Sequence, residues 1–226
     1  MRSRETVIGF LMLETRFPRI VGDAGCAATW HFPVIYETVP GASPARTVRG
    51  RARGLLPAFV RAGQKLVARG AAGIATTCGF LSLRQRELSA ALPAPVLSGA
   101  LLSGRRMQDS LPPGKKLGIL TASTGDLSAA HLDAAGIDGA RAVVGGPPPD
   151  SAFAAAFLRN RPQLNIDRAR AEMVVAAREL CGRGNIGALL LECANMPPYA
   201  AAVEAAVGVQ TRSLIDAVAD FRQTLP

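Results

Sequence analysis

Two cysteines stand just after two buried apolar segments of the chain. Cys78 follows the segment 73–77, and Cys193 follows the segment 186–191. Ligands of open parallel sheets bind beyond the carboxyl ends of the strands, so a polar group at such an end is well placed for chemistry. Each cysteine also precedes a predicted helix start, whose unpaired N–H groups would stabilise a thiolate and attract a carboxylate. Because a free thiol titrates near pH 8.5, we expect a modest shift to make one cysteine a usable base while the other stays protonated.

The two cysteine segments share one layout. A helical segment ending at Gly70 leads through a short strand to Cys78, and a second one ending at Gly184 leads through a strand to Cys193. Taken alone, a strand-end cysteine is more often a small core residue than a catalytic one. As a pair, two opposed thiols can invert a stereocentre, one removing a proton from one face and the other delivering a proton to the opposite face. We therefore expect the sulfurs to bracket one cleft, roughly 6 to 10 Å apart.

Along the chain, short apolar runs alternate with longer amphipathic segments, and these elements must position the thiols. The pattern is typical of parallel α/β architecture. The clearest helices cover 55–68 and 166–181, where apolar residues recur at helical spacing. The long connection 14–32 is predicted to cover a site. The predicted strands cover 6–13, 33–39, 73–77, 95–98, 116–121, 140–144, 186–191 and 207–211.

Composition narrows the class of protein. Hydrophobic residues make up 49% of the 226 residues but aromatic residues only 5%, so Ala, Val, Leu and Ile must build the core. The apolar run near the start ends at Glu14 without a small-residue cleavage site, which argues against a signal peptide. Because no apolar stretch reaches the roughly 18 to 20 residues that cross a bilayer, we expect a cytoplasmic protein without a membrane partner.

The remaining cysteines and histidines give no metal site. The four cysteines are scattered in no zinc-binding pattern, and the chain has only two histidines. We expect reduced thiols and no metal. Cys181 is predicted to be a core residue, Cys26 has no assigned role, and His131 is interpreted as an ordinary helix residue rather than part of a hydrolase site.

The net charge of +9 raises the question of an anionic partner. The basic residues are dispersed except for the run Arg46, Arg49, Arg51 and Arg53, which has no nearby aromatic residue to stack on a base. A solvated loop is favoured over a phosphate-binding patch, and we expect no nucleic-acid partner. Nucleotide-binding glycine motifs are also missing, so no nucleotide cofactor is expected.

The segments Thr76-Thr-Cys-Gly-Phe80 and Leu191-Glu-Cys-Ala-Asn-Met-Pro-Pro198 resemble the two cysteine motifs of the aspartate/glutamate racemase superfamily. This superfamily also includes hydantoin racemases, maleate isomerases and arylmalonate decarboxylases, and the likeness extends over nearly the whole chain. The resemblance implies two similar open parallel-sheet, Rossmann-like lobes related by a pseudo-twofold axis, with the site in the cleft between them. The lobes are expected to comprise residues 1–98 with 211–226, and residues 99–210. Assembly into a homo-oligomer stays open.

The resemblance also implies a function: a racemase or epimerase, free of pyridoxal phosphate and metal, acting on a small amino-acid or hydantoin-like carboxylate. Cys78 and Cys193 would be the catalytic residues. The expected substrate-binding residues flank the cysteines or follow the strand 116–121, and they are Thr77, Gly79, Phe80, Thr121, Ser123, Thr124, Ala194 and Asn195.

The chain departs from the amino-acid racemases next to both cysteines. Gly79 and Phe80 replace Asn-Thr after the first cysteine, while Glu192 and Ala194 replace the Gly and Thr that flank the second. These changes bring amino-acid specificity into question. The presence of both cysteines favours two-sided proton transfer over a one-cysteine decarboxylase. That decarboxylase, a cis-trans isomerase and a catalytically silent carboxylate-binding protein remain the alternatives.

Overall fold

Two four-stranded parallel sheets form the centre of the protein in a computed structural model that describes residues 5–225. The first sheet has the strand order β2-β1-β3-β4, with β1 at Ile8–Met12, β2 at Val34–Thr38, β3 at Gly73–Thr76 and β4 at Val96–Leu97. The second has the order β6-β5-β7-β8, with β5 at Lys116–Leu120, β6 at Ala142–Gly145, β7 at Ile186–Leu191 and β8 at Thr211–Arg212.

The two sheets repeat one topology. In each of them the first strand in sequence lies between the second and the third, and all pairings are parallel. The predicted α/β fold with two similar parallel-sheet lobes is therefore confirmed. The repeat makes β3 and β7 equivalent strands, so Cys78 and Cys193 occupy equivalent places in the two sheets.

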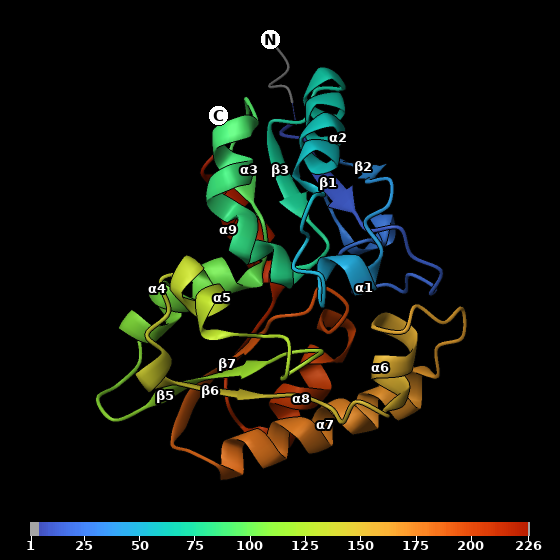
Figure 1. The fold of residues 1–226 in the computed structure, drawn as a ribbon. Helices are drawn as coiled ribbons and strands as arrows, with labels where there is room; N and C mark the ends of the chain where they lie inside the picture. The colour runs from blue at the N-terminus through green and yellow to red at the C-terminus, as the bar shows by residue number, and fades with distance from the viewer. Residues whose placement is uncertain (1–4, 226) are drawn as a thin grey trace.

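Helices cover the sheets in two groups (Figure 1). One group, with α2, α3 and α9, lies beside the first sheet; α6, α7 and α8 lie beside the second, and α4 and α5 lie near the junction. The bounds are α1 Pro44–Thr47, α2 Leu56–Ala68, α3 Gln85–Ala91, α4 Gly104–Asp109, α5 Ala129–Ala134, α6 Ala152–Phe157, α7 Ile166–Gly182, α8 Ala200–Val207 and α9 Leu214–Gln223. Short 3-10 helices occupy Ala27–Thr29, Gly79–Arg84, Ala100–Ser103, Gly139–Arg141 and Pro197–Tyr199.

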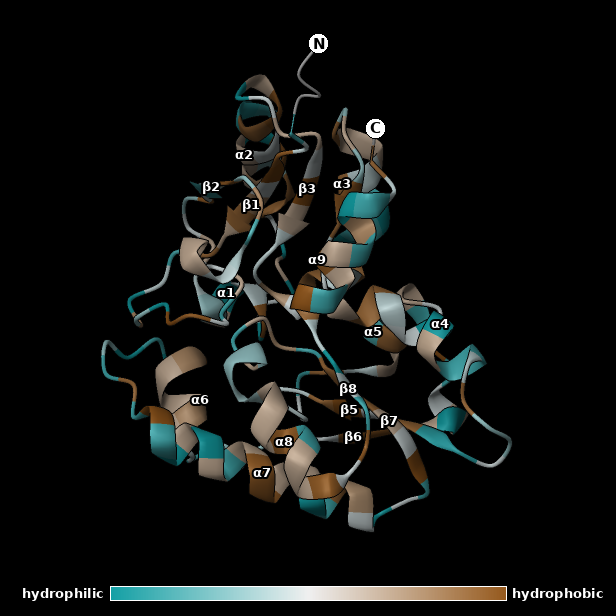
Figure 2. Cartoon of the chain, turned by 180° about the vertical axis from the view of Figure 1, so that it is seen from behind, coloured by the Kyte–Doolittle hydropathy of each residue, from teal (hydrophilic) through white to brown (hydrophobic). Residues whose placement is uncertain are grey.

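Apolar strands at the centre and amphipathic helices outside give the molecule its core (Figure 2). One buried cluster runs through both sheets and includes Phe10 and Ile74 of the first together with Ile119 and Leu190 of the second. A second cluster fills the space between the second sheet and α6, α7 and α8, where Met173 of α7 is fully buried. The junction between the sheets is thus packed with apolar side chains, which fixes the loops that follow their strands.

The last strand corrects the sequence prediction. The segment 207–211 was expected to be a strand, but Val207 ends α8, and Gly208 takes the left-handed conformation with φ of 63° that terminates many helices. The strand β8 begins only at Thr211 and belongs to the second sheet. The proposed lobe boundary at residue 211 therefore precedes this strand, whereas α9 packs against the first sheet, where Phe221 lies beside Gly73. The two-lobe division of the chain stays a prediction.

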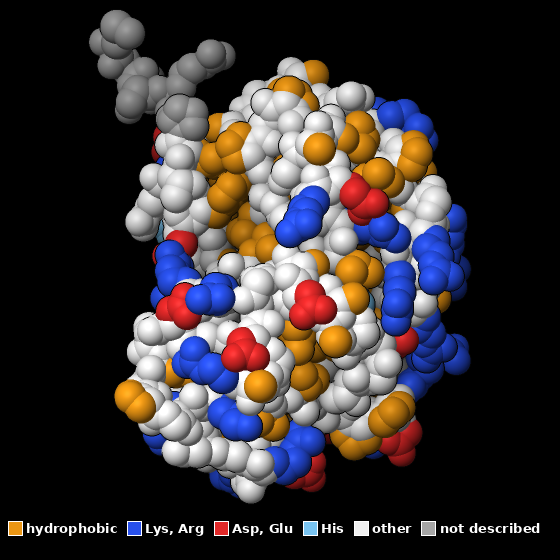
Figure 3. All heavy atoms as spheres, turned by 60° about the vertical axis from the view of Figure 1, so that its left-hand side comes forward, with side chains coloured by type: hydrophobic (Ala, Val, Ile, Leu, Met, Phe, Trp, Pro, Cys, Tyr) orange, Lys and Arg blue, Asp and Glu red, His pale blue; other side chains and the backbone are white. Residues whose placement is uncertain are grey.

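The surface mixes charges of both signs. In Figure 3, Lys and Arg side chains are spread over the face, several of them beside Asp or Glu. Exposed pairs such as Arg105 with Asp109 are part of this pattern. Within residues 5–225, no helix combines the length and apolar character that a membrane crossing requires.

Candidate active site

The candidate site lies where the carboxyl ends of β3 and β7 meet. In each sheet the chain reverses its direction of winding between the central strands, β1 and β3 in one and β5 and β7 in the other. Ligands of doubly wound sheets bind at this switch point. Gly79, after β3, packs against Glu192, after β7, and the N–H of Ala24, in the connection after β1, donates to the carbonyl of Ala194. The loops after the equivalent strands therefore form one junction.

Cys78 is buried at the start of the 3-10 helix Gly79–Arg84, with only 6% of its surface exposed. Backbone N–H groups of Phe80 and Leu81 point toward its sulfur and favour the thiolate. Burial nevertheless outweighs them, and together with the nearby Glu192 carboxylate it raises the pKa of Cys78 to about 12. The thiol is therefore protonated at neutral pH.

Cys193 is partly exposed and lies in the turn after β7. Its thiol donates a hydrogen bond to the Oδ1 atom of Asn195 at 3.6 Å. Burial of the sulfur and then the charge of Glu192 raise the pKa of Cys193 well above its ordinary value, and the charge of Cys78 raises it further. The expectation that a helix start lowers the pKa of one thiol enough to make it a base is wrong, because removal from water outweighs the few N–H groups that face each sulfur.

Glu192 is a buried acid at the candidate site to which the sequence assigned no role. Its side chain is fully buried, and its Oε2 atom accepts a hydrogen bond from the hydroxyl of Thr121 at 2.8 Å. Its Oε1 atom is buried without a hydrogen-bond partner among the described residues. Burial raises the pKa of Glu192 to about 7, although Thr121 and the N–H of Ala122 partly offset this. The signals in the sequence were an acidic residue directly after an apolar strand and its departure from the glycine that flanks the second cysteine in the amino-acid racemases.

The long connection 14–32 reaches the second cysteine. Asp23 is almost fully buried and accepts a hydrogen bond from Nδ2 of Asn195 at 2.6 Å. It also pairs with Arg19 at 2.9 Å and accepts a hydrogen bond from the N–H of Gly25. Asn195 accepts the hydrogen bond from the thiol of Cys193, and Asp23 connects this residue to the segment 14–32. The predicted covering segment lies against the candidate site.

The predicted carboxylate-binding hydroxyls lie after β3 and β5, but most of them donate to protein acceptors. Thr77 donates to the carbonyl of Leu11 at 3.5 Å, and Ser123 donates to Asp126 at 2.6 Å. Thr121 donates to Glu192. Phe80 is buried with its ring edge against His131, and Ala194 is fully buried. The role of these residues toward a substrate stays a prediction.

A cavity of about 210 Å³ lies beside the loop after β5. Its lining brings Arg49 of the basic run together with Ser123 and Thr124, and it adds Arg159. One arginine of the basic run thus shares a cavity with residues of the loop after β5. Ala122, whose N–H bonds Glu192, also lines it and links it to the cysteine junction.

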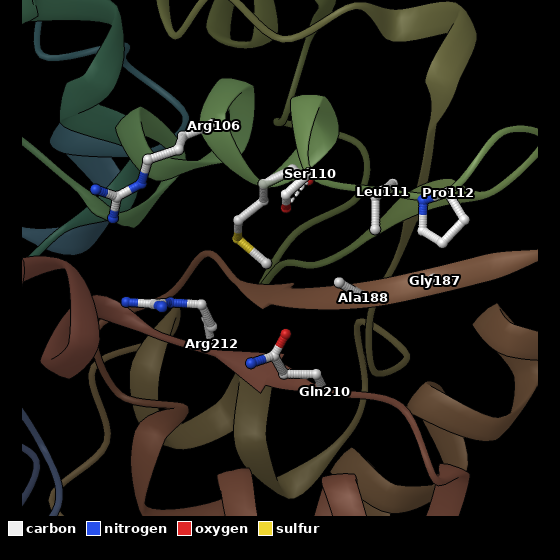
Figure 4. A pocket seen from close by; sticks show the side chains of 9 residues that line it. Arg106, Ser110, Leu111, Pro112, Gly187, Ala188, Gln210 and Arg212 are labelled. Atoms are coloured by element: carbon white, nitrogen blue, oxygen red, sulfur yellow. Dashed lines mark hydrogen bonds between the residues drawn. The ribbon is translucent and has the colours of Figure 1, made fainter.

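A larger hollow of about 400 Å³ lies away from the cysteines, between α4 and the strands β7 and β8 (Figure 4). Its arginines, Arg106 and Arg212, both pair with Asp220, so their charge is largely compensated. It contains no cysteine, and Gly187 and Ala188 place it at the start of β7, opposite to the end that carries Cys193. Residues 5–225 also contain no group of three or more His, Cys, Asp or Glu side chains arranged to bind a metal.

Comparison with known proteins identifies the fold. No family model matches the chain. A glycine-to-cysteine variant of arylmalonate decarboxylase with associated sulfate aligns at a TM-score of 0.61 and 18% identity, covering 94% of this chain and 91% of that one. Aspartate racemase from Picrophilus torridus aligns at 0.55 and 15% identity, covering 91% and 87%. A putative Asp/Glu racemase from Yersinia pestis aligns at 0.59 and 14% identity, covering 97% and 100%. The chain has the fold of the aspartate/glutamate racemase superfamily, as its cysteine motifs indicate.

Curated sequence relatives carry a different activity in their names. Dimethylsulfoniopropionate lyase 7 from Emiliania huxleyi (strain CCMP1516) is 24% identical over 229 residues, which cover 96% of this chain and 67% of that protein. A dimethylsulfoniopropionate lyase from Durusdinium sp. clade D is 24% identical over 222 residues, covering 95% and 73%. The relatives and structural neighbours thus include lyases, racemases and decarboxylases.

Proposed function

We propose that this protein is a cofactor-independent racemase or epimerase that moves the proton on the carbon next to the carboxylate of a small acid. Cys78 and Cys193 are the acid–base pair. One observation carries the proposal: the two thiols follow equivalent strands of two repeated sheets whose carboxyl ends meet at one junction. The charge of one thiolate raises the pKa of the other cysteine, which fits a closely spaced pair.

In the proposed reaction, one cysteine thiolate takes the proton from the α-carbon, so that an S–H bond forms as the C–H bond breaks. The thiol of the other cysteine then donates its proton to the opposite face of the carbanion. Each turnover leaves the charge on the second sulfur, ready for the mirror-image substrate. The raised pKa values suit this step, because a thiolate that holds its proton more tightly is the stronger base toward a weakly acidic carbon.

Recognition of the substrate carboxylate is proposed at the loops around the cysteines. The N–H groups that follow Cys78 favour negative charge on the sulfur and are suited to an anion. The cavity lined by Arg49, Ser123, Thr124 and Arg159 adds positive charge and a hydroxyl donor beside the same junction. Gly79, Phe80, Ala194 and Asn195 complete the proposed surroundings.

A second candidate is a lyase, which the names of the curated relatives favour. Elimination from a compound such as dimethylsulfoniopropionate begins with the same removal of an α-proton. The bond from the β-carbon to sulfur then breaks, dimethyl sulfide leaves, and acrylate remains. The two candidates therefore differ in what happens to the carbanion, and one cysteine base is sufficient for elimination.

Deuterium incorporation tests the shared step and separates the two outcomes. The purified protein is incubated in deuterated water with single enantiomers of aspartate, glutamate and hydantoins, and with dimethylsulfoniopropionate, and the products are followed by proton NMR. Deuterium at the α-carbon with loss of optical activity is expected for a racemase. Acrylate without racemisation of any substrate would replace the racemase proposal by the lyase. No exchange and no acrylate with the whole panel would instead favour the binding-protein alternative.

Substitution of each cysteine by serine tests the division of labour between the thiols. A serine hydroxyl has similar size but cannot supply a thiolate-like base near neutrality. Net racemisation should fall by at least about a hundredfold in both Cys78→Ser and Cys193→Ser, the scale of general acid–base catalysis. In deuterated water, each variant should still exchange the proton of one enantiomer, and the preferred enantiomer should differ between them. Full activity in either variant contradicts two-base catalysis.

A further inference from the structure

Glu192 connects the surroundings of both cysteines. It directly precedes Cys193 in the sequence, and its carboxyl group packs against Gly79, which directly follows Cys78. A Cβ atom at position 79 would overlap the Oε1 atom of Glu192, so only glycine leaves room for this carboxyl group. A single buried acid is thus the neighbour of Cys193 in sequence and of the residue after Cys78 in space, and its charge acts on both thiols.

The hydrogen bonding of Glu192 is poor for an ionised carboxylate. Thr121 and the N–H of Ala122 supply its hydrogen bonds, and the Oε1 atom has no partner among the described residues. A fully buried carboxylate needs a cation or several donors to stay charged. The basic group that acts on this region is Arg19, which favours the thiolate of Cys78 but pairs directly with Asp23. Asp23 itself adds negative charge near Cys193.

We propose that Glu192 is a charge regulator of the two-cysteine site: its neutral form permits a thiolate at Cys78 or Cys193, and its ionised form suppresses both. The inference rests on the proposed function for its catalytic meaning. The carboxyl group acts through the sulfurs and needs no contact with substrate, so Glu192 is a positioning residue. Its titration near pH 7 places the change within the range where the thiols are needed.

Repulsion between like charges fixes the sign of the effect. Two negative charges a few ångströms apart in a dry region repel strongly, so ionisation of Glu192 makes removal of a proton from either thiol harder. Below pH 7 the carboxyl group is neutral, and the thiolate fraction rises tenfold for each pH unit. As Glu192 ionises near pH 7, its growing charge opposes the gain in thiolate, and the rise becomes shallower. Once the carboxyl group is fully charged, the tenfold rise resumes at a lower thiolate fraction.

Alkylation of the thiols by iodoacetamide tests the proposal without any substrate. Modification of Cys193 and Cys78 is followed peptide by peptide by mass spectrometry between pH 5.5 and 9. The wild-type rate should rise less steeply between about pH 7 and pH 8 and then steeply again, while Glu192→Gln should rise without a break. The two proteins should react equally at pH 5.5, and the variant should be about tenfold faster at pH 8.5, the effect of one pKa unit.

Two controls separate charge from structure. Glu179→Gln removes the same charge from an exposed position on α7 and should leave the profile unchanged. Cys181, whose pKa is raised by burial without any contribution from Glu192, should react alike in all proteins. A faster reaction of Glu192→Gln at every pH would indicate a loosened fold and overturn the proposal. A straight wild-type profile would overturn it even if the variant failed to fold.

This outcome is independent of the racemase proposal. If no substrate is turned over but the alkylation profile changes slope near pH 7, the role of Glu192 as a charge regulator is supported and the proposed racemase reaction is contradicted. If substrates are racemised with a straight alkylation profile, the reaction is supported and the regulator is refuted.

Discussion

Gly79 shows how a single missing side chain shapes the junction between the sheets. A Cβ atom there would overlap the Oε1 and carbonyl oxygens of Glu192, and on the other side the Cα atom of Gly79 lies against Gly99. Because the obstacle includes backbone on both sides, a rotation of one side chain cannot relieve it. Gly79→Ala should therefore lower the free energy of unfolding by about 2 kcal/mol, as overpacking of a dense site does, and should displace Cys78.

Chemical denaturation and proton exchange with substrate measure these two effects. Gly182→Ala is the matched control, because Gly182 ends α7 with no atom within 4 Å of the position of a Cβ atom. Alanine is the better helix residue, so this variant should be unchanged or more stable by about 0.5 kcal/mol. Wild-type stability and activity in Gly79→Ala would show that Glu192 can move to accept the added Cβ atom without loss of stability.

The cysteines could be located from the sequence, but the burial and hydrogen bonding of the acid next to them could not. Cys78 and Cys193 follow apolar runs, and such runs reveal strand ends without knowledge of the partner strands. Glu192 follows the same kind of run, but its importance depends on Thr121, which is 71 residues away in the sequence. Burial is likewise a property of the assembled fold. This is why the direction of the thiol pKa shifts was predicted wrongly.

At the scale of elements, the connection 14–32 holds the turn that carries Cys193. Asp23 is the anchor, since it binds Arg19, Asn195 and the backbone of Gly25. Asp23→Ala removes all three contacts and leaves the largely buried guanidinium of Arg19 without its partner. Loss of one member of a buried ion pair costs about 3 kcal/mol. Hydrogen–deuterium exchange should become faster in 14–32 and in the turn after β7.

Asp167→Ala is the control for this prediction. Asp167 forms an ion pair with Arg170, but its side chain is 88% exposed, and such pairs contribute at most about 1 kcal/mol. Exchange in 14–32 should not change in this variant. If Asp23→Ala leaves the exchange of that connection at the wild-type rate, Asp23 is not its anchor.

The elements themselves were predictable to different degrees. The strand 186–191 and the helices α2 and α7 were predicted to within one residue, because a long apolar run or a repeated helical spacing defines each of them. β8 was misplaced because it has only two residues, and its neighbour α8 continues through apolar alanines and valines up to Gly208. A strand of this length is defined by its pairing with β7 rather than by its own sequence.

At the scale of the whole molecule, the stability should carry the signature of the buried acid. The pKa of Glu192 rises from about 4.5 to about 7 in the folded protein, so the folded state binds this proton more tightly than the unfolded chain does. The contribution of protonated Glu192 to the free energy of unfolding is complete below pH 4.5, decreases as the pH rises, and is lost above pH 7. The shift corresponds to about 3 kcal/mol.

Other titrating groups must be separated from this effect. Burial lowers the pKa of His131, so its contribution is lost as the pH falls and has the opposite sign. The raised pKa of Cys78 affects stability only above about pH 9. Both groups are present in Glu192→Gln, so the difference between wild type and variant isolates Glu192. Urea unfolding at pH 5 and pH 8 should show that the difference in the free energy of unfolding between wild type and variant shifts against the wild type by about 2.5 kcal/mol. An equal difference at the two pH values would mean that the carboxyl group titrates at its ordinary pKa, and that the fold holds a carboxylate near its two cysteines throughout the neutral range.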